Sequence, residues 1–172
     1  MELVLFINFA FYFCTLSFYW KFIGRFFMFP SDFLTITQKT GHVYESFCTS
    51  VCKKYGLNQS AFDLILFLAN NPSLNTARDV CEIRGIKKGI VSVTTEKLVK
   101  DGYLIREDDP SDRRIVRLFL TEKCDSVVAD GKAAQEHFFQ AIASGLSMEE
   151  FAMFDCILGK IRKKIIELEK EI

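Results

Sequence analysis

The sequence has little of what metal proteins, disulfide-rich proteins and most enzymes need. It contains two histidines, and its six cysteines include no Cys-x-x-Cys pair and no spacing of a disulfide framework. Scattered cysteines of this kind are typical of reduced thiols, so we expect a cytoplasmic location. We find no nucleophile beside a base, no paired catalytic carboxylates and no glycine-rich phosphate loop. The sequence therefore predicts no enzyme, no metal and no cofactor.

Net charge is absent as well. The chain has 22 Lys and Arg against 22 Asp and Glu, so its formal net charge is +0 at pH 7. This balance excludes a basic surface over the whole protein. Residues 84–117 differ, because nine Lys and Arg there outnumber six Asp and Glu. A modest positive face on a neutral body is typical of a protein that contacts nucleic acid over a small area.

A long apolar run occurs at the N-terminus, over Leu3–Trp20. Its length reaches the lower limit for a membrane span, and Lys21 and Arg25 would then keep the following domain cytoplasmic. The basic start and small-residue cleavage site of a secretory signal are missing. The residues leave three interpretations open for segment 1–27: it precedes a natural start at Met28, it is a membrane or interface helix, or it is a helix buried in an oligomer.

The rest of the chain, residues 28–172, is predicted to form one mainly helical domain. Apolar residues at helical spacing predict helices at about 31–55, 59–69, 77–84, 88–100 and 121–144, and a last helix from 147 onward. Capping residues support the helix starts at Asn58, Thr76 and Ser147. Glycines at 56, 85 and 102 are typical of helix ends.

Two short apolar runs flank a charged turn after the fourth of these helices. Tyr103–Ile105 and Ile115–Leu120 favour strands, and Asp109–Arg114 between them carries the turn-forming Pro110. Short helices followed by a two-stranded hairpin predict a winged helix-turn-helix. The fold class is therefore mainly α with a small two-stranded β-wing. In this fold helix 88–100 enters the major groove, and the hairpin lies along the backbone or in the minor groove.

The last helix is strongly amphipathic. Its apolar stripe consists of Phe151, Phe154, Leu158, Ile161, Ile165 and Leu168. A small domain has little core left to cover such a stripe, so we expect a partner helix. Long helices on both sides of a winged helix, here about 31–55 and 121–170, are typical of a two-fold dimer whose reading helices lie one DNA turn apart.

Residues of about 40–168 resemble the multiple antibiotic resistance regulator (MarR) family of bacterial transcription factors. The similarity is carried by Lys97–Leu104, Asp109–Arg114, Val116–Lys123 and Leu146–Phe151. The resemblance implies an obligate homodimer that binds a short palindromic operator in double-stranded DNA through residues of about 57–121. It also implies a transcriptional regulator, most often a repressor, that a small-molecule effector releases from DNA.

For the wing, the resemblance implies a role for each of three neighbouring side chains. Arg114 would enter the minor groove, Asp112 would orient it, and Arg113 would lie on a phosphate. The alternative is that both arginines form a solvated charge cluster with Asp109 and Asp112. The winged-helix frame favours DNA contact, because guanidinium groups at a hairpin tip stay charged in a narrow, negative groove.

For the reading helix, the resemblance implies that Lys88, Ser92 and Thr94 occupy the exposed side. Lys87 and Lys88 lie at the end that approaches DNA, so we expect both to contact it. Two positions depart from the family. Lys87 replaces a frequent Ser or Thr, which removes the usual N-cap, and Val93 stands where Arg is common, which removes one base contact.

The remaining chemistry concerns an effector. Relatives in this family bind aromatic or lipophilic effectors, so aromatic side chains could line a cavity for one, or could equally be core and dimer interface. The residues in question are Tyr44, Phe47, Phe138 and Phe151.

Cys48 and Cys52 lie four residues apart and therefore share one helix face. They predict either a redox switch, since some relatives sense oxidants through cysteine, or small buried apolar residues. Two alternative functions follow from the sequence: a thiol-based redox-sensing regulator, and a winged-helix protein-interaction module. The second would be tethered to a membrane only if residues 3–20 are native and inserted.

Overall fold

The computed structural model describes residues 30–171 of the chain. The chain divides into two units, residues 1–43 and 44–172. The first unit contains the beginning of helix α2 (Pro30–Tyr55), whose side chains from Ser31 to Val43 are all exposed. The apolar segment 1–27 lies outside the described residues, so its three interpretations remain predictions. None of the helices within residues 30–171 has the length and apolar composition needed to cross a bilayer.

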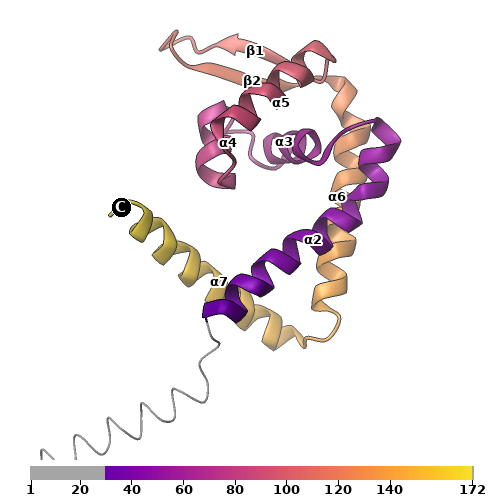
Figure 1. The fold of residues 1–172 in the computed structure, drawn as a ribbon, viewed down its shortest axis with the longest axis vertical. Coiled ribbons are helices and arrows are strands. Elements are labelled where there is room, and N and C mark those ends of the chain that lie inside the picture. Colours follow the sequence, from indigo (N-terminus) through magenta and orange to yellow (C-terminus); the bar gives the residue numbers. More distant parts are fainter. Residues whose placement is uncertain (1–29, 172) are drawn as a thin grey trace, which may run out of the picture. The chain divides into compact units, whose positions relative to one another are not determined.

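The second unit is a winged helix-turn-helix followed by two long helices (Figure 1). The elements after α2 are α3 (Gln59–Asn70), α4 (Ala77–Arg84), α5 (Lys88–Lys100), β1 (Leu104–Asp108), β2 (Val116–Leu120), the short 3-10 helix η1 (Glu122–Cys124), α6 (Asp125–Ala143) and α7 (Met148–Glu169). The strands pair antiparallel, with Leu104 opposite Leu120 and Asp108 opposite Val116. The predicted fold class, mainly α with a two-stranded wing, is confirmed.

Local side-chain chemistry sets the helix boundaries. Asn58 Oδ1 accepts a hydrogen bond from the Ala61 amide at the start of α3, at 2.8 Å. Thr76 begins α4 in a capping box with Asp79, and Gly85 ends it with a φ of +63°, a conformation that favours glycine. These starts and stops lie where the sequence predicts them.

One predicted helix begins differently. The sequence places a helix start at Thr121, but the chain first makes the 3-10 turn η1, and α6 begins at Asp125. The Thr121 hydroxyl donates to the Gly102 carbonyl at 2.8 Å and forms no cap with the following turn. The residue therefore fastens the end of the wing to the end of α5 before the helix starts.

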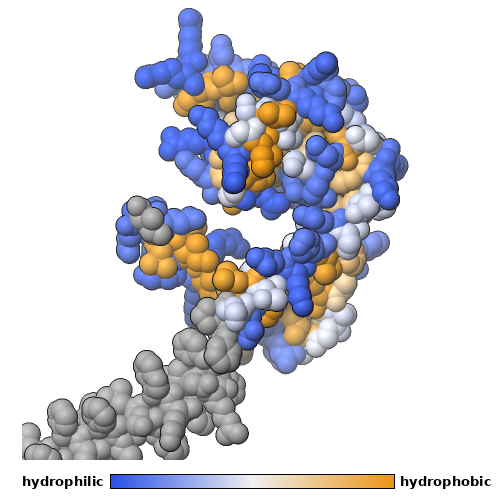
Figure 2. Space-filling model, in the orientation of Figure 1, coloured by the Kyte–Doolittle hydropathy of each residue, from blue (hydrophilic) through white to orange (hydrophobic). Residues whose placement is uncertain are grey.

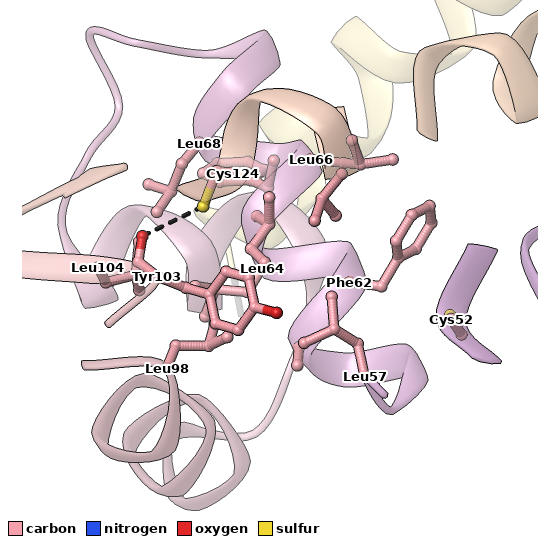
Figure 3. Packing of buried hydrophobic residues seen from close by; sticks show 14 of the residues in the cluster. Cys52, Leu57, Phe62, Leu64, Leu66, Leu68, Leu98, Tyr103, Leu104 and Cys124 are labelled. Carbon is pink, nitrogen blue, oxygen red and sulfur yellow. Dashed lines mark hydrogen bonds between the residues drawn. The ribbon is translucent and has the colours of Figure 1, made fainter. Parts of the chain in front are cut away.

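The core of this unit is centred on α3, which is buried along most of its length. Leu98 of α5, Leu104 of β1 and Cys124 of η1 pack around it (Figure 3). The Cys124 thiol donates to the Tyr103 carbonyl at 3.1 Å. On the other side α6 passes so close that a Cβ at Gly131 would lie 2.7 Å from a methyl carbon of Leu66. Helix α3 is thus held between α5, the wing and α6.

Helix α7 has a different character, because none of its described residues is buried. The predicted apolar stripe is exposed throughout, from 36% at Ile161 to 47% at Ile165. Figure 2 shows apolar surface gathered along this C-terminal helix. The structure therefore contains an amphipathic helix whose apolar side is not covered by its own unit.

Candidate nucleic-acid interface

The reading helix α5 packs one face against α3 and α4 and turns the other outward. Lys88 and Ser92 are exposed, as predicted. Thr94 is buried, with 8% of its surface exposed, so the prediction that it lies on the outer side is wrong. The reason is helical phase: Thr94 follows Val91 by three residues and precedes Leu98 by four, and both of these are core residues.

The N-terminus of α5 carries positive charge without a side-chain cap. Lys87 is the N-cap residue, and its side chain forms no capping hydrogen bond. Lys87 and Lys88 are both exposed. The uncapped backbone amides and the helix dipole favour an anion here, and the two ammonium groups add to that preference.

The wing tip presents the predicted arginine and acid as a local pair. The Arg114 side chain is 92% exposed, and its Nε donates to Asp112 Oδ1 at 3.3 Å. The same oxygen accepts the Arg114 backbone amide at 3.0 Å. An exposed pair of this kind contributes little to stability, about 0–1 kcal/mol. Asp112 therefore limits the directions of the Arg114 side chain, while most of the guanidinium stays exposed.

A buried acid at the start of the wing's turn was missed by sequence reasoning. Asp109 is 4% exposed, and its carboxylate accepts hydrogen bonds from the Ser111 hydroxyl, the Ser111 amide and the Arg117 guanidinium. These donors hold the pKa of Asp109 well below its usual range, and the two hydrogen bonds from Ser111 have the largest influence. The carboxylate therefore stays charged at neutral pH and shapes the turn that carries Arg114.

Arg117 extends this contact to the segment before α4. Its Nη1 donates to Asn75 Oδ1 at 2.8 Å, and the Leu118 amide donates to the Asn75 carbonyl at 2.7 Å. We call Asn75, Asp109 and Arg117 the wing tie. Because Asn75 precedes the Thr76 cap of α4, the wing tie connects the wing directly to the helix-turn-helix.

A hollow of about 530 Å³ separates part of the wing from the helices. It lies between α4, α5 and the strands, and Lys88, Ser92 and Arg106 are among its lining residues. The buried Thr95 hydroxyl in its wall has no hydrogen-bond partner among the described residues. Since packing is incomplete on this side, the orientation of the wing depends more strongly on the wing tie.

The predicted aromatic set is only partly brought together. The Phe138 ring contacts those of Tyr44 and Phe47 edge-on, with centroids at 5.3 and 5.8 Å. Phe151 lies on α7, is 41% exposed, and is not part of the ring contacts found within residues 30–171. A separate hollow of about 220 Å³ is lined by Tyr44 and mainly by polar groups, among them Asp63 and Gln135.

The structure favours the apolar interpretation of the two helix cysteines. Cys48 and Cys52 are buried, and burial raises the pKa of both thiols, that of Cys52 to about 11. The nearby Lys54 ammonium is bonded to Asp130 at 2.6 Å. Neutral buried thiols are unreactive, so these residues act as small core side chains. Within residues 30–171 no group of three or more His, Cys, Asp or Glu is placed to hold a metal ion.

Comparisons with known proteins agree with this geometry. The sequence model of the MarR family matches residues 55–115. The transcriptional regulator SlyA matches with a TM-score of 0.69 at 20% identity, covering 79% of this chain and 95% of that chain. A MarR transcriptional regulator from Methanosarcina mazei Go1 has the same score and identity, covering 81% and 99%. The S. aureus MepR–DNA complex matches with a TM-score of 0.64 at 15% identity, covering 78% and 96%.

The structural matches establish a shared fold that extends over nearly the whole length of each of these regulators. The family match is a statement about sequence, and it covers α3, α4, α5 and the first part of the wing. Residues 55–115 are therefore similar in sequence to the MarR family, and the fold around them is the one that these regulators share.

Proposed function

We propose that this protein is a dimeric, DNA-binding transcriptional regulator. The observation that carries the proposal is the exposed wing-tip pair of Arg114 and Asp112, next to an exposed, lysine-flanked reading helix. One structural relative, MepR, has been solved in complex with DNA. The same type of fold in this chain presents positive side chains at the two places where a winged helix meets a duplex.

Each basic residue has a distinct task in this proposal. Lys87 and Lys88, at the start of α5, contact the phosphates beside the major groove, where the helix N-terminus also favours anions. Arg113 contacts a phosphate along the wing. Arg114 enters the minor groove, whose negative potential attracts a guanidinium. Ser92, exposed on α5, faces the base edges.

The homodimer is built from the long helices. The exposed stripe of α7 and the exposed beginning of α2 supply apolar surface outside the winged helix, including Leu34, Ile36 and Leu158. Burying such surface against a second copy is favourable by about 25 cal/mol for each Å². Two-fold symmetry then places two reading helices on the half-sites of a palindromic operator, roughly 34–36 Å apart.

Regulation follows from the position of the hollow lined by Tyr44, Asp63 and Gln135. Its walls come from α2, α3, α4 and α6, so a bound small molecule would contact both the winged helix and the helices that lead away from it. An effector that prefers one spacing of the two reading helices shifts the dimer toward it and changes DNA affinity. We propose that this effector releases a repressor, and that the ring cluster of Tyr44, Phe47 and Phe138 supports its site.

The test begins with a duplex selected from a random pool by the full-length protein. Arg114→Ala is expected to weaken binding to this duplex by about 1–3 kcal/mol, the usual size for a groove arginine. Lys132→Ala removes one exposed charge from α6 and serves as the control, with affinity expected to stay within about twofold. Unchanged affinity in Arg114→Ala would overturn the role of the wing tip.

Salt dependence separates the proposal from the protein-interaction alternative. Binding of a regulator to its operator weakens steeply as salt rises, because phosphate contacts release counterions. We therefore expect affinity for the selected duplex to fall with salt and to exceed affinity for a scrambled duplex. A protein that enriches no sequence at low salt would not be a DNA-binding regulator.

A further inference from the structure

The reading helix has few of the side chains that usually recognise bases. Of the residues that form paired hydrogen bonds with guanine or adenine in the major groove, Lys88–Lys100 contains lysine but no Arg, Asn or Gln. Thr94 and Thr95, which could also bond to bases, are buried. In the N-terminal half of α5 the exposed polar side chains are Lys88 and Ser92. Hydrogen bonding alone therefore leaves this helix with little capacity to select a sequence.

The same half of the helix exposes two branched aliphatic side chains. Ile90 is 46% exposed and Val93 is 68% exposed. Being three residues apart, they lie together on the outer face of α5, away from the buried Val91 and Leu98. Single exposed apolar residues need no explanation. Ile90 and Val93, however, form a neighbouring pair just after Lys88, on the face that a winged helix presents to DNA. Such a pair does need an explanation.

Gly89 supports close approach of a partner at this place. A Cβ at Gly89 would meet no heavy atom within 4 Å, so the packing of the chain itself does not require a glycine there. The missing side chain leaves the backbone beside Ile90 open to a surface lying against the helix. With Lys87 and Lys88 adjacent, that surface is expected to be negatively charged.

We propose that Ile90 and Val93 read the C5-methyl groups of thymines in the major groove. This inference rests on the proposed function and adds to it the bases that the reading helix prefers. Thymine is the base that presents a methyl group on the major-groove edge, and apolar side chains contact it. Against a G·C pair the same side chains would cover polar atoms and leave them without hydrogen bonds. Each operator half-site therefore carries thymines at the two steps facing Ile90 and Val93.

The experiment removes the methyl groups one at a time. The full-length protein first selects a duplex from a random pool, and each thymine of its half-sites is then replaced singly by uracil, which differs only in lacking the methyl. Burial of one methyl group contributes about fourfold in affinity. We expect about this loss at two steps of each half-site, and no change at the other thymines.

Two variants identify which side chain contacts which of the two thymines. In Val93→Ala, replacement of thymine by uracil at one of the two steps should no longer matter, while the other step keeps its effect; Ile90→Ala should show the reverse. Both residues are exposed, so neither variant is expected to disturb the core. Loss of methyl sensitivity at one step is a change that mere weakening of the fold would not produce.

The outcomes separate this inference from the proposed function. Selective DNA binding with equal affinity for thymine and uracil duplexes would overturn the methyl reading and leave the regulator proposal standing. Methyl sensitivity that both alanine variants retain would also overturn it, because other residues would then make the contact. A protein that selects no duplex would overturn both.

Discussion

Helices α3 and α7 use their apolar residues in opposite ways. In α3, buried residues account for most of the helix, and Phe62, Ile65 and Leu66 are almost completely enclosed. In α7, a longer helix with a regular apolar stripe, no described residue is buried. The winged helix therefore carries a core of its own, whereas α7 leaves its apolar side exposed. In the proposed dimer, folding and assembly would be supported by these two different parts of the chain.

The difference also separates the origins of stability and of function. Contacts around α3 hold the reading helix and the wing together within one protomer. In the proposed dimer, a second copy covers the apolar side of α7, and this contact determines how far apart the two reading helices lie. Changes in the core should thus act on unfolding, and changes on α7 should act on assembly.

The largest effect is expected from the centre of the core. Phe62→Ala removes a fully buried ring and leaves a cavity between α3 and α6, so the free energy of unfolding should fall by about 3–5 kcal/mol. Denaturant unfolding followed by circular dichroism measures this. Phe119→Ala, at a phenylalanine of β2 that is 36% exposed, is the matched control with a smaller loss. Equal losses in both would show that α3 is not the centre of stability.

The next effect concerns the stripe of α7. Leu158→Glu combined with Ile161→Glu places two carboxylates where the proposed dimer buries apolar surface, so the dimer dissociation constant should rise roughly a hundredfold, about 3 kcal/mol. Sedimentation measures the association. Lys163→Glu, on the opposite side of α7, is the control and should remain dimeric. An unchanged dimer in the double variant would place the interface elsewhere.

Much of the fold could be predicted because its signals are local. Thr76, Gly85 and the apolar spacing within Lys88–Lys100 determine where α4 ends and α5 runs, and each acts over a few residues. The pairing of Asp112 with Arg114 is equally local. Where the prediction was wrong, a distant contact decides: the Thr121 hydroxyl bonds to Gly102, across the whole wing, and so does not begin α6.

The candidate site shows the same limit. Thr94 was expected on the outer face from family resemblance, whereas packing against the rest of the core determines the phase of α5 and buries it. The wing tie joins Asn75 to Arg117, which lie 42 residues apart in the sequence. A pairing over that distance becomes visible only when the fold brings β2 beside the segment that precedes α4.

A pH experiment tests whether the C-terminal part of α2 belongs to the core. Burial raises the pKa of Cys52 to about 11, while the thiol of the unfolded chain titrates near its ordinary value of about 8.5. Between these values the unfolded state has lost a proton that the folded state keeps, so stability is complete below pH of about 8.5 and falls above it. Between pH 7.5 and 10, the wild type should lose about 1–2 kcal/mol more than Cys52→Ala.

The control for this experiment is thiol labelling of the folded protein at neutral pH. Cys156 is exposed on α7 and should react quickly, while Cys48 and Cys52 should react only when the protein unfolds. Parallel pH profiles for the wild type and Cys52→Ala would mean that this thiol is not enclosed. Rapid labelling of Cys48 with loss of DNA binding would restore the redox-sensing alternative.

The variant with the smallest expected effect tests whether the wing is part of the core or moves independently of it. Arg117→Lys keeps the charge but cannot bond to Asp109 and Asn75 together, because an ammonium lacks the planar fork of a guanidinium. We expect DNA affinity to fall about fivefold, close to 1 kcal/mol, and hydrogen exchange to quicken at the wing amides, with unfolding of the core little changed. Asn70→Ala, which removes an amide bonded to Gln135 on α6, is the control and should leave exchange in the wing unaltered. If Arg117→Lys instead lowers the stability of the core and leaves wing exchange unchanged, the wing tie supports the core and does not position Arg114.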